Sequence, residues 1–144
     1  MNIASILARK GPKVFTIRPE QSIRAAIASL AEHNIGALVV VDEAGKPIGI
    51  ISERDIVREA AGNERVFSKA VGEIMTRDVI VGTPQDDLVS VGSTMTEKRI
   101  RHLPVVDKGR LIGIVTLGDV VKAQRDQYRG EVDTLQIQIM EEQT

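Results

Sequence analysis

Apolar residues recur along this chain in the same order twice. Residues 14–58 can be written above residues 79–122 so that Val14 falls on Val79 and Asp55 on Asp119. The offset changes from 65 to 64 residues in a single loop, which is one residue shorter in the second copy. Hairpin turns tolerate that kind of deletion. Internal repetition of this kind predicts two copies of one structural unit.

Each copy has the pattern of a strand, a helix, two more strands and a second helix. Residues 22–34 carry apolar side chains at helical spacing, with Ser22 as a suitable N-cap. The corresponding segment, 86–99, contains glycine, serine and threonine and is a weaker helix former. Short β-branched or alternating runs predict three strands in each copy: 13–17, 37–42 and 47–52 in the first, and 78–82, 103–107 and 111–116 in the second.

Neither copy has enough apolar residues for a comfortable core of its own, so the two should pack together. The predicted fold class is α+β, with two tandem β-α-β-β-α repeats packed about a pseudo-two-fold axis. Five units are expected along the chain: an N-terminal helical segment (1–12), a first repeat (13–61), a linker helix (62–77), a second repeat (78–126) and a C-terminal helical extension (127–144).

The two terminal segments carry apolar stripes outside the repeats. Each stripe has helical spacing: Ile3, Ile6 and Leu7 in the first segment, and Val132, Leu135 and Ile139 in the second. Such stripes need burial, and closed two-fold dimers are the commonest oligomers. The sequence therefore predicts a homodimer that buries them.

Composition narrows the function classes. The chain of 144 residues has 19 basic and 20 acidic side chains and a formal charge of −1, which favours neither nucleic acid nor an anionic membrane as a partner. The absence of cysteine excludes disulfides, thiolate zinc sites and cysteine catalysis. The apolar runs are strand-sized, whereas a membrane helix needs about 20 residues. We expect a soluble, cytoplasmic protein.

One short motif stands between the third strand and the second helix of each copy. Ser52 and Asp55 form it in the first copy, and Thr116 and Asp119 form it in the second. A hydroxyl and a carboxylate three residues apart can make a capping box, although glutamate or glutamine is the usual acid. The carboxylate can also accept both hydroxyl hydrogens of a ribose, while a helix N-terminus attracts phosphate. Its occurrence twice in register favours a ligand site over capping alone.

These features resemble the cystathionine-β-synthase-type domains, also called CBS domains. The resemblance rests on "GIISERD", "GIVTLGD", the strand "HLPVVD" and the 64-residue period, and it covers about residues 10–126. It implies a Bateman module, a pair of repeats that regulates a partner protein without being an enzyme. It also implies an adenosine-containing ligand in clefts between the repeats. AMP is the first candidate, followed by ATP, ADP, NAD(H) and S-adenosylmethionine, and no metal is implied.

The resemblance also implies which residues form the two clefts. One would combine early and middle strands of the first repeat with the second motif: Thr16, Ile17, Ala37, Leu38, Thr116, Gly118 and Asp119. The other would combine the matching strands of the second repeat with the first motif: Val81, Gly82, Arg101, His102, Leu103, Pro104, Ser52, Arg54 and Asp55. The aspartates would hold ribose, and the strands would enclose adenine.

The two clefts are expected to differ in charge. Arg54, Arg101 and His102 belong to one, with Arg58 a helical turn further, whereas only Lys122 is expected near the other. Arginine pairs well with phosphate, so the cleft of Asp55 is the expected phosphate site. A solvated surface base is the simpler interpretation of Arg58. The sequence has no nucleotide-binding glycine loop and no pattern of catalytic residues, so the main alternative is a ligand-free interaction scaffold.

Overall fold

The computed structural model describes residues 1–142; the last two residues of the predicted C-terminal extension, 143–144, lie outside the described residues. The elements run in chain order as α1 (Ile3–Lys10), β1 (Thr16–Ile17), α2 (Ile23–His33), β2 (Ala37–Val41), β3 (Pro47–Ser52), α3 (Glu53–Gly62), a 3₁₀ turn η1 (Val66–Ser68), α4 (Val71–Ile74), α5 (Leu88–Lys98), β4 (His102–Asp107), β5 (Arg110–Thr116) and α6 (Leu117–Glu142). This order confirms the α+β fold class and its two repeated units.

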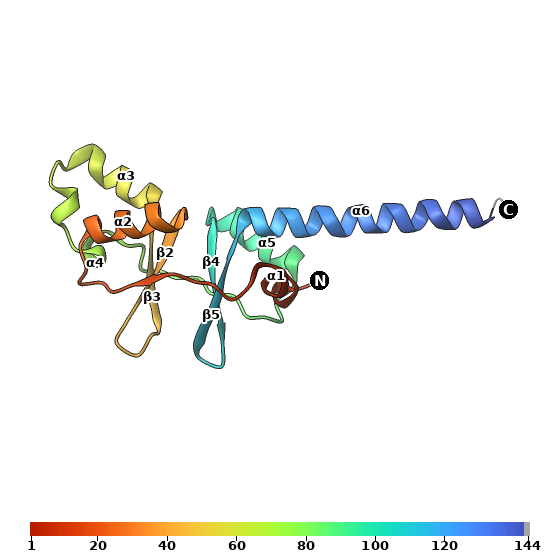
Figure 1. Ribbon diagram of the computed structural model, residues 1–144, viewed down its shortest axis with the longest axis horizontal. Helices are drawn as coiled ribbons and strands as arrows, with labels where there is room; N and C mark the ends of the chain where they lie inside the picture. The colour runs from red at the N-terminus through yellow and green to blue at the C-terminus, as the bar shows by residue number, and fades with distance from the viewer. Residues whose placement is uncertain (143–144) are drawn as a thin grey trace.

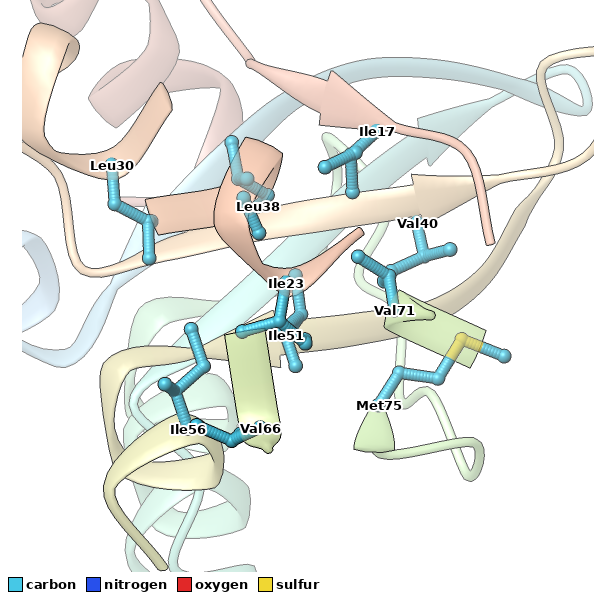
Figure 2. Close-up of a cluster of buried hydrophobic side chains, with 11 residues drawn as sticks. Ile17, Ile23, Leu30, Leu38, Val40, Ile51, Ile56, Val66, Val71 and Met75 are labelled. Carbon is cyan, nitrogen blue, oxygen red and sulfur yellow. The ribbon is translucent and has the colours of Figure 1, made fainter. Parts of the chain in front are cut away.

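The first repeat is a three-stranded sheet covered by helices. β1 pairs in parallel with β2, and β2 pairs antiparallel with β3. The ribbons of β2 and β3 lie side by side in Figure 1. Every residue of β2 is buried, as its β-branched composition predicts. Ile23 of α2, Ile56 of α3 and Val71 of α4 meet the sheet in one apolar cluster (Figure 2). Each such buried side chain contributes roughly 1.5–3 kcal/mol relative to exposure.

Helix α2 begins and ends at residues suited to those positions. The Oγ of Ser22 accepts a hydrogen bond of 3.1 Å from the backbone N–H of Ala25, which confirms the predicted cap. Asn34 ends the helix in the left-handed region at φ 52°, a conformation that asparagine tolerates. Arg99 holds the equivalent position after α5 at φ 56°. An arginine there costs about 1 kcal/mol relative to a right-handed conformation.

The second repeat has the same arrangement with less sheet. β4 and β5 form an antiparallel pair, but residues 78–82, the predicted first strand, pair with β4 only through one bridge at Gly82. Pro104 accounts for the difference. In the first repeat the N–H of Val39 donates to the carbonyl of Phe15 at 3.2 Å, and Pro104 stands at the position of Val39 without an N–H. The strand predicted over 78–82 was therefore wrong in extent.

Each core contains a short helix that precedes the other repeat in the chain. α1, at the start of the chain, packs Ile3 and Ile6 into the core of the second repeat. α4, which precedes the second repeat, packs Val71 into the core of the first. The backbone contacts also correspond, because Ile3 donates to the carbonyl of Asp86 at 3.0 Å and Val71 to that of Gln21 at 2.8 Å. α1 thus joins the start of the chain to the second repeat, across the whole of the first.

The N-terminal stripe that we expected to mediate dimerisation is buried inside the chain. Ile3 is 0% exposed, and Leu7 packs against the same core. That part of the prediction was wrong because the repeat pattern does not show where α1 docks. Glycine at two positions leaves room for side chains of these segments, Leu7 of α1 and Met75 at the end of α4. A Cβ at Gly113 would lie 2.8 Å from Leu7 Cδ2, and a Cβ at Gly49 would lie 2.6 Å from Met75 Sδ.

The last helix extends far beyond the folded body (Figure 1). α6 has 26 residues, and its first turns contribute Val120 and Ala123 to the core of the second repeat. Further along, five large apolar side chains are between 54% and 68% exposed: Tyr128, Leu135, Ile137, Ile139 and Met140. Over residues 1–142, none of the helices combines the length and apolarity needed to cross a membrane.

Candidate functional site

Both Ser/Thr-x-x-Asp motifs lie where a strand passes directly into a helix. The Oγ of Ser52 accepts the N–H of Asp55 at 3.2 Å, and the Asp55 carboxylate accepts the N–H of Ser52 at 3.0 Å. Thr116 and Asp119 make the same two bonds at 3.1 and 2.9 Å. Each motif is therefore a capping box. A carboxylate has about four acceptor positions, so capping does not preclude a ligand.

The first motif opens onto a cavity of about 350 Å³ between the repeats, called the Asp55 cleft below. This volume lies in the range of about 300–1,000 Å³ that is typical of ligand pockets. The cleft is formed by the β3–α3 junction, the segment after α4, and the segment from the end of α5 to the start of β4. Its lining residues are Gly36, Ile50, Ser52, Glu53, Arg54, Asp55, Arg58, Thr76, Asp78, Val79, Ile80, Lys98, Arg99, Ile100, Arg101 and His102.

The predicted residues of this cleft fall into two groups. Five of them line it together: Ser52, Arg54, Asp55, Arg101 and His102. Four others are not among its lining residues: Val81, Gly82, Leu103 and Pro104. Leu103 is buried in the core of the second repeat, Gly82 donates a backbone hydrogen bond of 2.8 Å to Pro104, and Val81 is 44% exposed. The lining comes instead from the residues just before these, 78–80 and 98–102.

Basic side chains dominate the Asp55 cleft. Five basic side chains line it: Arg54, Arg58, Lys98, Arg99 and Arg101. Within residues 1–142, only three acidic side chains line the same cleft. Among the residues that the structure describes, none of these five forms an ion pair. The equivalent positions at the second motif hold only one lysine or arginine: Gly118, Lys122, His33, Asn34 and Gly36. The two copies therefore differ in charge at these matched positions.

Thr76 fixes the Asp55 side chain from the other side of the cleft. Its Oγ1 donates to Asp55 Oδ1 at 3.3 Å, while Asp55 Oδ2 accepts from Ser52. The backbone of Thr76 pairs with that of Ile50 through hydrogen bonds of 2.9 and 3.0 Å. The segment after α4 is thereby attached to β3, and it positions the carboxylate at the edge of the cleft.

The Asp119 carboxylate is occupied by a lysine from α1. The Nζ of Lys10 donates to Asp119 Oδ2 at 2.7 Å and to the carbonyl of Ile114 at 3.0 Å. In the first repeat the equivalent carbonyl, that of Ile50, accepts the N–H of Thr76 instead. The second motif therefore has an internal cation where the first has an open cleft.

This ion pair determines the electrostatics of the second motif. Burial alone would raise the pKa of Asp119, but the hydrogen bonds from Lys10 and Thr116 lower it below its ordinary value. Gly118 of the same motif is exposed. The expectation that only Lys122 lies near this site was wrong, because α1 brings Lys10 to it.

The other residues predicted for the Asp119 cleft lie apart from that carboxylate. Ile17, Ala37 and Leu38 are 5%, 5% and 0% exposed, and Ile17 and Leu38 belong to the core of the first repeat. Thr16 is exposed in β1. The cavity that Asp119 lines, of about 220 Å³, is formed by Met1 and by residues of α1 and α6, and not by β1 or β2.

His102 lies where the repeats face each other. A Cβ at Gly36 would be 3.4 Å from its Nε2, so the imidazole packs on the chain just before β2. Burial lowers the pKa of His102, and the nearby Lys10 and Arg101 lower it further against two carboxylates that raise it. The ring is therefore neutral near pH 7, with one nitrogen to donate and one to accept a hydrogen bond.

Several lining residues were missed from the sequence. Lys98 and Arg99 lie at the end of α5, and Thr76 and Asp78 lie in or beside the predicted linker, so the motif did not point to them. One signal was present. The left-handed position that holds Asn34 in the first copy holds an arginine in the second, and strained residues cluster at functional sites.

Comparisons with known proteins agree with this architecture. The family model "CBS domain" matches the chain twice, at residues 5–62 and 71–126. The CBS domain-containing protein YhcV of Bacillus subtilis is 35% identical over 112 residues, which is 78% of this chain and 79% of YhcV. A CBS-domain-containing protein of Agrobacterium tumefaciens superposes with a TM-score of 0.82 at 39% identity, over 86% of this chain and 99% of its own. The CBS domain pair of protein MJ0100, in complex with 5′-methylthioadenosine and S-adenosyl-L-methionine, superposes with a TM-score of 0.78 at 34% identity, over 88% and 98%.

Proposed function

Because this chain belongs to the CBS domain family, with two repeats in tandem, we propose that it is a non-enzymatic regulatory module that binds an adenosine nucleotide in the Asp55 cleft. AMP is the preferred ligand, and ADP, ATP and NAD(H) share its recognised groups. One observation carries the proposal. Five basic side chains, none in an ion pair within residues 1–142, gather at one of two equivalent motifs.

Each part of the nucleotide has a counterpart in the cleft. The Asp55 carboxylate accepts the two ribose hydroxyls, since it keeps free acceptor positions beside its bonds to Ser52 and Thr76. Arg54, Arg58, Lys98, Arg99 and Arg101 provide charge-assisted donors for phosphate, and the N-terminus of α3 adds its dipole. Adenine meets the apolar part of the lining: Ile50, Val79, Ile80 and Ile100.

The charge of the cleft favours a phosphate ester over S-adenosylmethionine. The MJ0100 domain pair binds S-adenosyl-L-methionine and 5′-methylthioadenosine, so a related cleft can hold adenosine with a sulfur substituent. S-adenosylmethionine carries a positive sulfonium, and five bases facing it would be repulsive. AMP places its negative charge among the same five bases.

A ligand-free interaction scaffold is the competing function. The complete capping boxes favour it, because Ser52 and Asp55 already satisfy each other without a ligand. Capping does not require the bases, however, and a scaffold would show no selectivity for ribose or phosphate. Nucleotide titration therefore separates the two functions.

The decisive experiment is calorimetry with AMP on two matched aspartate variants. Asp55→Asn should weaken AMP roughly 10- to 150-fold, since a hydrogen bond to a charged group contributes about 1.5–3 kcal/mol. Asp119→Asn is the control: its carboxylate is engaged by Lys10, so AMP affinity should stay within about twofold. Unchanged binding by Asp55→Asn, or the main loss in Asp119→Asn, would contradict the assignment.

Ligand analogues on the same protein test the parts of the proposal. Arg54→Ala and Arg101→Ala should weaken AMP and leave adenosine nearly unchanged, because only the phosphate loses a partner. A 2′-deoxy analogue should bind less tightly than AMP. If the Asp119→Asn protein binds AMP no better than adenosine, the bases are ordinary surface charges and the phosphate site is wrong. Tighter binding of S-adenosylmethionine would replace the nucleotide by that ligand.

We further propose that two chains associate and that the pair regulates a protein partner, which the sequence does not name. The support is the exposed apolar part of α6, since Leu135 and Ile139 are 57% and 54% exposed. Nucleotide binding would then alter the surface that the protein partner contacts.

A further inference from the structure

We infer that α6, from Val121 onward, pairs with the same helix of a second copy of this chain as a parallel two-stranded coiled coil. The inference deepens the association proposed above by naming its surface and orientation. It does not depend on nucleotide binding, which is read out separately below.

The seam of this coiled coil is visible in the residue spacing. Six positions of α6 alternate by four and three residues, as a heptad repeat requires: Val121, Arg125, Tyr128, Val132, Leu135 and Ile139. Val121 and Tyr128 are 56% and 67% exposed, and Leu135 and Ile139 are 57% and 54% exposed. An apolar seam of this length has no covering element within the described chain (Figure 1).

The residue types at the seam select the kind of partner. Val132 and Ile139 fall on one class of seam position and Tyr128 and Leu135 on the other. In heptad notation these are a and d respectively. β-branched residues at a with leucine at d favour parallel pairs over larger bundles. A second copy of the same helix supplies the matching surface, since each knob then meets its own counterpart.

The protein's own body leaves most of the seam exposed, and only Val121 at its base borders a groove lined by α5. Val120 and Ala123 face the core of the second repeat and are 0% and 6% exposed, whereas Val121 between them is 56% exposed. At about 100° per residue, the centre of the seam lies about 130° around the helix from that buried face. A second helix can therefore approach along the seam beyond Val121 without displacing the folded domain.

Charges beside the seam permit the parallel arrangement. In a parallel pair Gln124 would lie across from Arg129 of the second copy, and Glu131 would lie across from Gln136. Neither contact opposes like charges, but a parallel pair brings the two Arg125 side chains together within the seam. Arg125 is a polar residue at an a position, and such a residue fixes the register of a coiled coil while weakening it.

The helix benefits from a partner. Residues 121–139 span fewer than three heptads, and isolated helices of about 12–15 residues are marginal in water. Gly130 lowers helix propensity by about 1 kcal/mol relative to alanine, but it faces away from the seam and has open space around it. Burial of the seam against a second copy provides the stabilisation that propensity does not.

Two variants that each replace an exposed apolar residue by glutamate distinguish a coiled coil from non-specific apolar association. Leu135 lies on the seam and Ile137 on the opposite face, and both are 57% exposed. By sedimentation velocity the unaltered protein should be a dimer at tens of micromolar. Leu135→Glu should weaken the dimer by roughly 100-fold or more, because two buried leucines are lost, while Ile137→Glu should remain dimeric. A monomeric unaltered protein, or equal effects of the two variants, would overturn the inference.

Single cysteines test the orientation, since the chain has none of its own. Tyr128→Cys and Leu135→Cys should each form an interchain disulfide under mild oxidation, because a parallel pair places each residue beside its copy. In an antiparallel pair centred on one of them, the other two residues would be about 21 Å apart. Cross-linking of one variant alone overturns the parallel arrangement. AMP titration of Leu135→Glu should be unchanged, so loss of the dimer and loss of the proposed ligand are distinguishable.

Discussion

At the scale of single residues, two aspartates in the same motif have different neighbours. Asp55 accepts hydrogen bonds from Ser52 and Thr76 and borders an open, basic cleft. Asp119 accepts the ammonium of Lys10, whose side chain is 31% exposed. The two repeats thus carry equivalent carboxylates, and the docking of α1 gives Asp119 an internal ion pair that Asp55 lacks.

The Lys10–Asp119 pair predicts a specific pH dependence of stability. Because Lys10 and Thr116 hold the pKa of Asp119 below its ordinary value of 3.8, the stabilisation is fully present above that value and is lost as the pH falls through the folded-state pKa. Lys10→Met should therefore lower the free energy of unfolding by about 1 kcal/mol at pH 7. The difference from the unaltered protein should shrink in urea titrations between pH 4 and pH 3.

A matched variant provides the control for that experiment. In an Asp119→Asn background, Lys10→Met should have little further effect at pH 7, because the two side chains act as a pair. If the effect of Lys10→Met is the same at pH 3 as at pH 7, the ion pair is not the source of the stability.

The sequence allowed some residue roles to be predicted and not others. Ser52, Asp55, Thr116 and Asp119 were found because a motif repeated in register carries a local hydrogen-bond geometry. Lys10 could not be found in that way. It lies 109 residues before Asp119 and outside the repeat, and only the docking of α1 brings the two together.

At the scale of elements, the end of α5 combines a strained backbone conformation with a position in the proposed nucleotide cleft. Arg99 holds the left-handed position that favours glycine or asparagine, and it lines the Asp55 cleft. The first repeat has Asn34 at the same position, and Asn34 does not line that cleft. A residue that strains its helix end and also lines the proposed nucleotide cleft is a candidate for a functional role.

Exchange of these two residues between the repeats tests that interpretation. Arg99→Asn should stabilise the protein by about 0.5–1 kcal/mol, or roughly 2–4 °C in melting temperature. It should also weaken AMP roughly three- to tenfold and leave adenosine unchanged. The reciprocal Asn34→Arg should destabilise the protein without affecting AMP. A variant Arg99→Asn with unchanged stability and unchanged AMP affinity would contradict both parts.

The helices were easier to predict than the strands. α2 has periodic apolar residues and a serine cap, and these local signals do not depend on contacts with distant parts of the chain. The first strand of the second repeat depends on a partner in another part of the chain. Its pairing with β4 is limited by Pro104, because one missing N–H in β4 removes the ladder bond that its counterpart makes. Strand pairing is a non-local property, and a strand-like run alone does not determine it.

At the scale of the whole molecule, the exchange of α1 and α4 joins the two repeats into one folding unit. The core of the second repeat is incomplete without Ile3, which precedes the first repeat. The core of the first repeat is likewise incomplete without Val71. Because α1 completes the second core from ahead of the first repeat, the chain of the first repeat is joined to that core at both ends, and we expect the two repeats to unfold together.

Native-state hydrogen exchange should detect this coupling. Ile3→Ala should lower global stability by about 2–5 kcal/mol, since Ile3 is fully buried. Ile3 belongs to the core of the second repeat and not to that of the first. If the repeats unfold together, the hydrogen-exchange protection of β2 should still fall by the same amount as that of β4. Loss of protection in β4 with β2 unaffected would show that the repeats unfold independently.

The geometry of α6 has a mechanical consequence. Its first turn contains Asp119, anchored by Lys10, and its far end lies well outside the body (Figure 1). From Asp119 to Met140 the helix is about 32 Å long. A pivot of about 5° at the anchored turn would move the tip by about 3 Å, which is more than half the rise of a helical turn. A tilt of α6 at the second motif that is too small to alter the fold there would therefore displace the far end of the helix enough to shift its contacts.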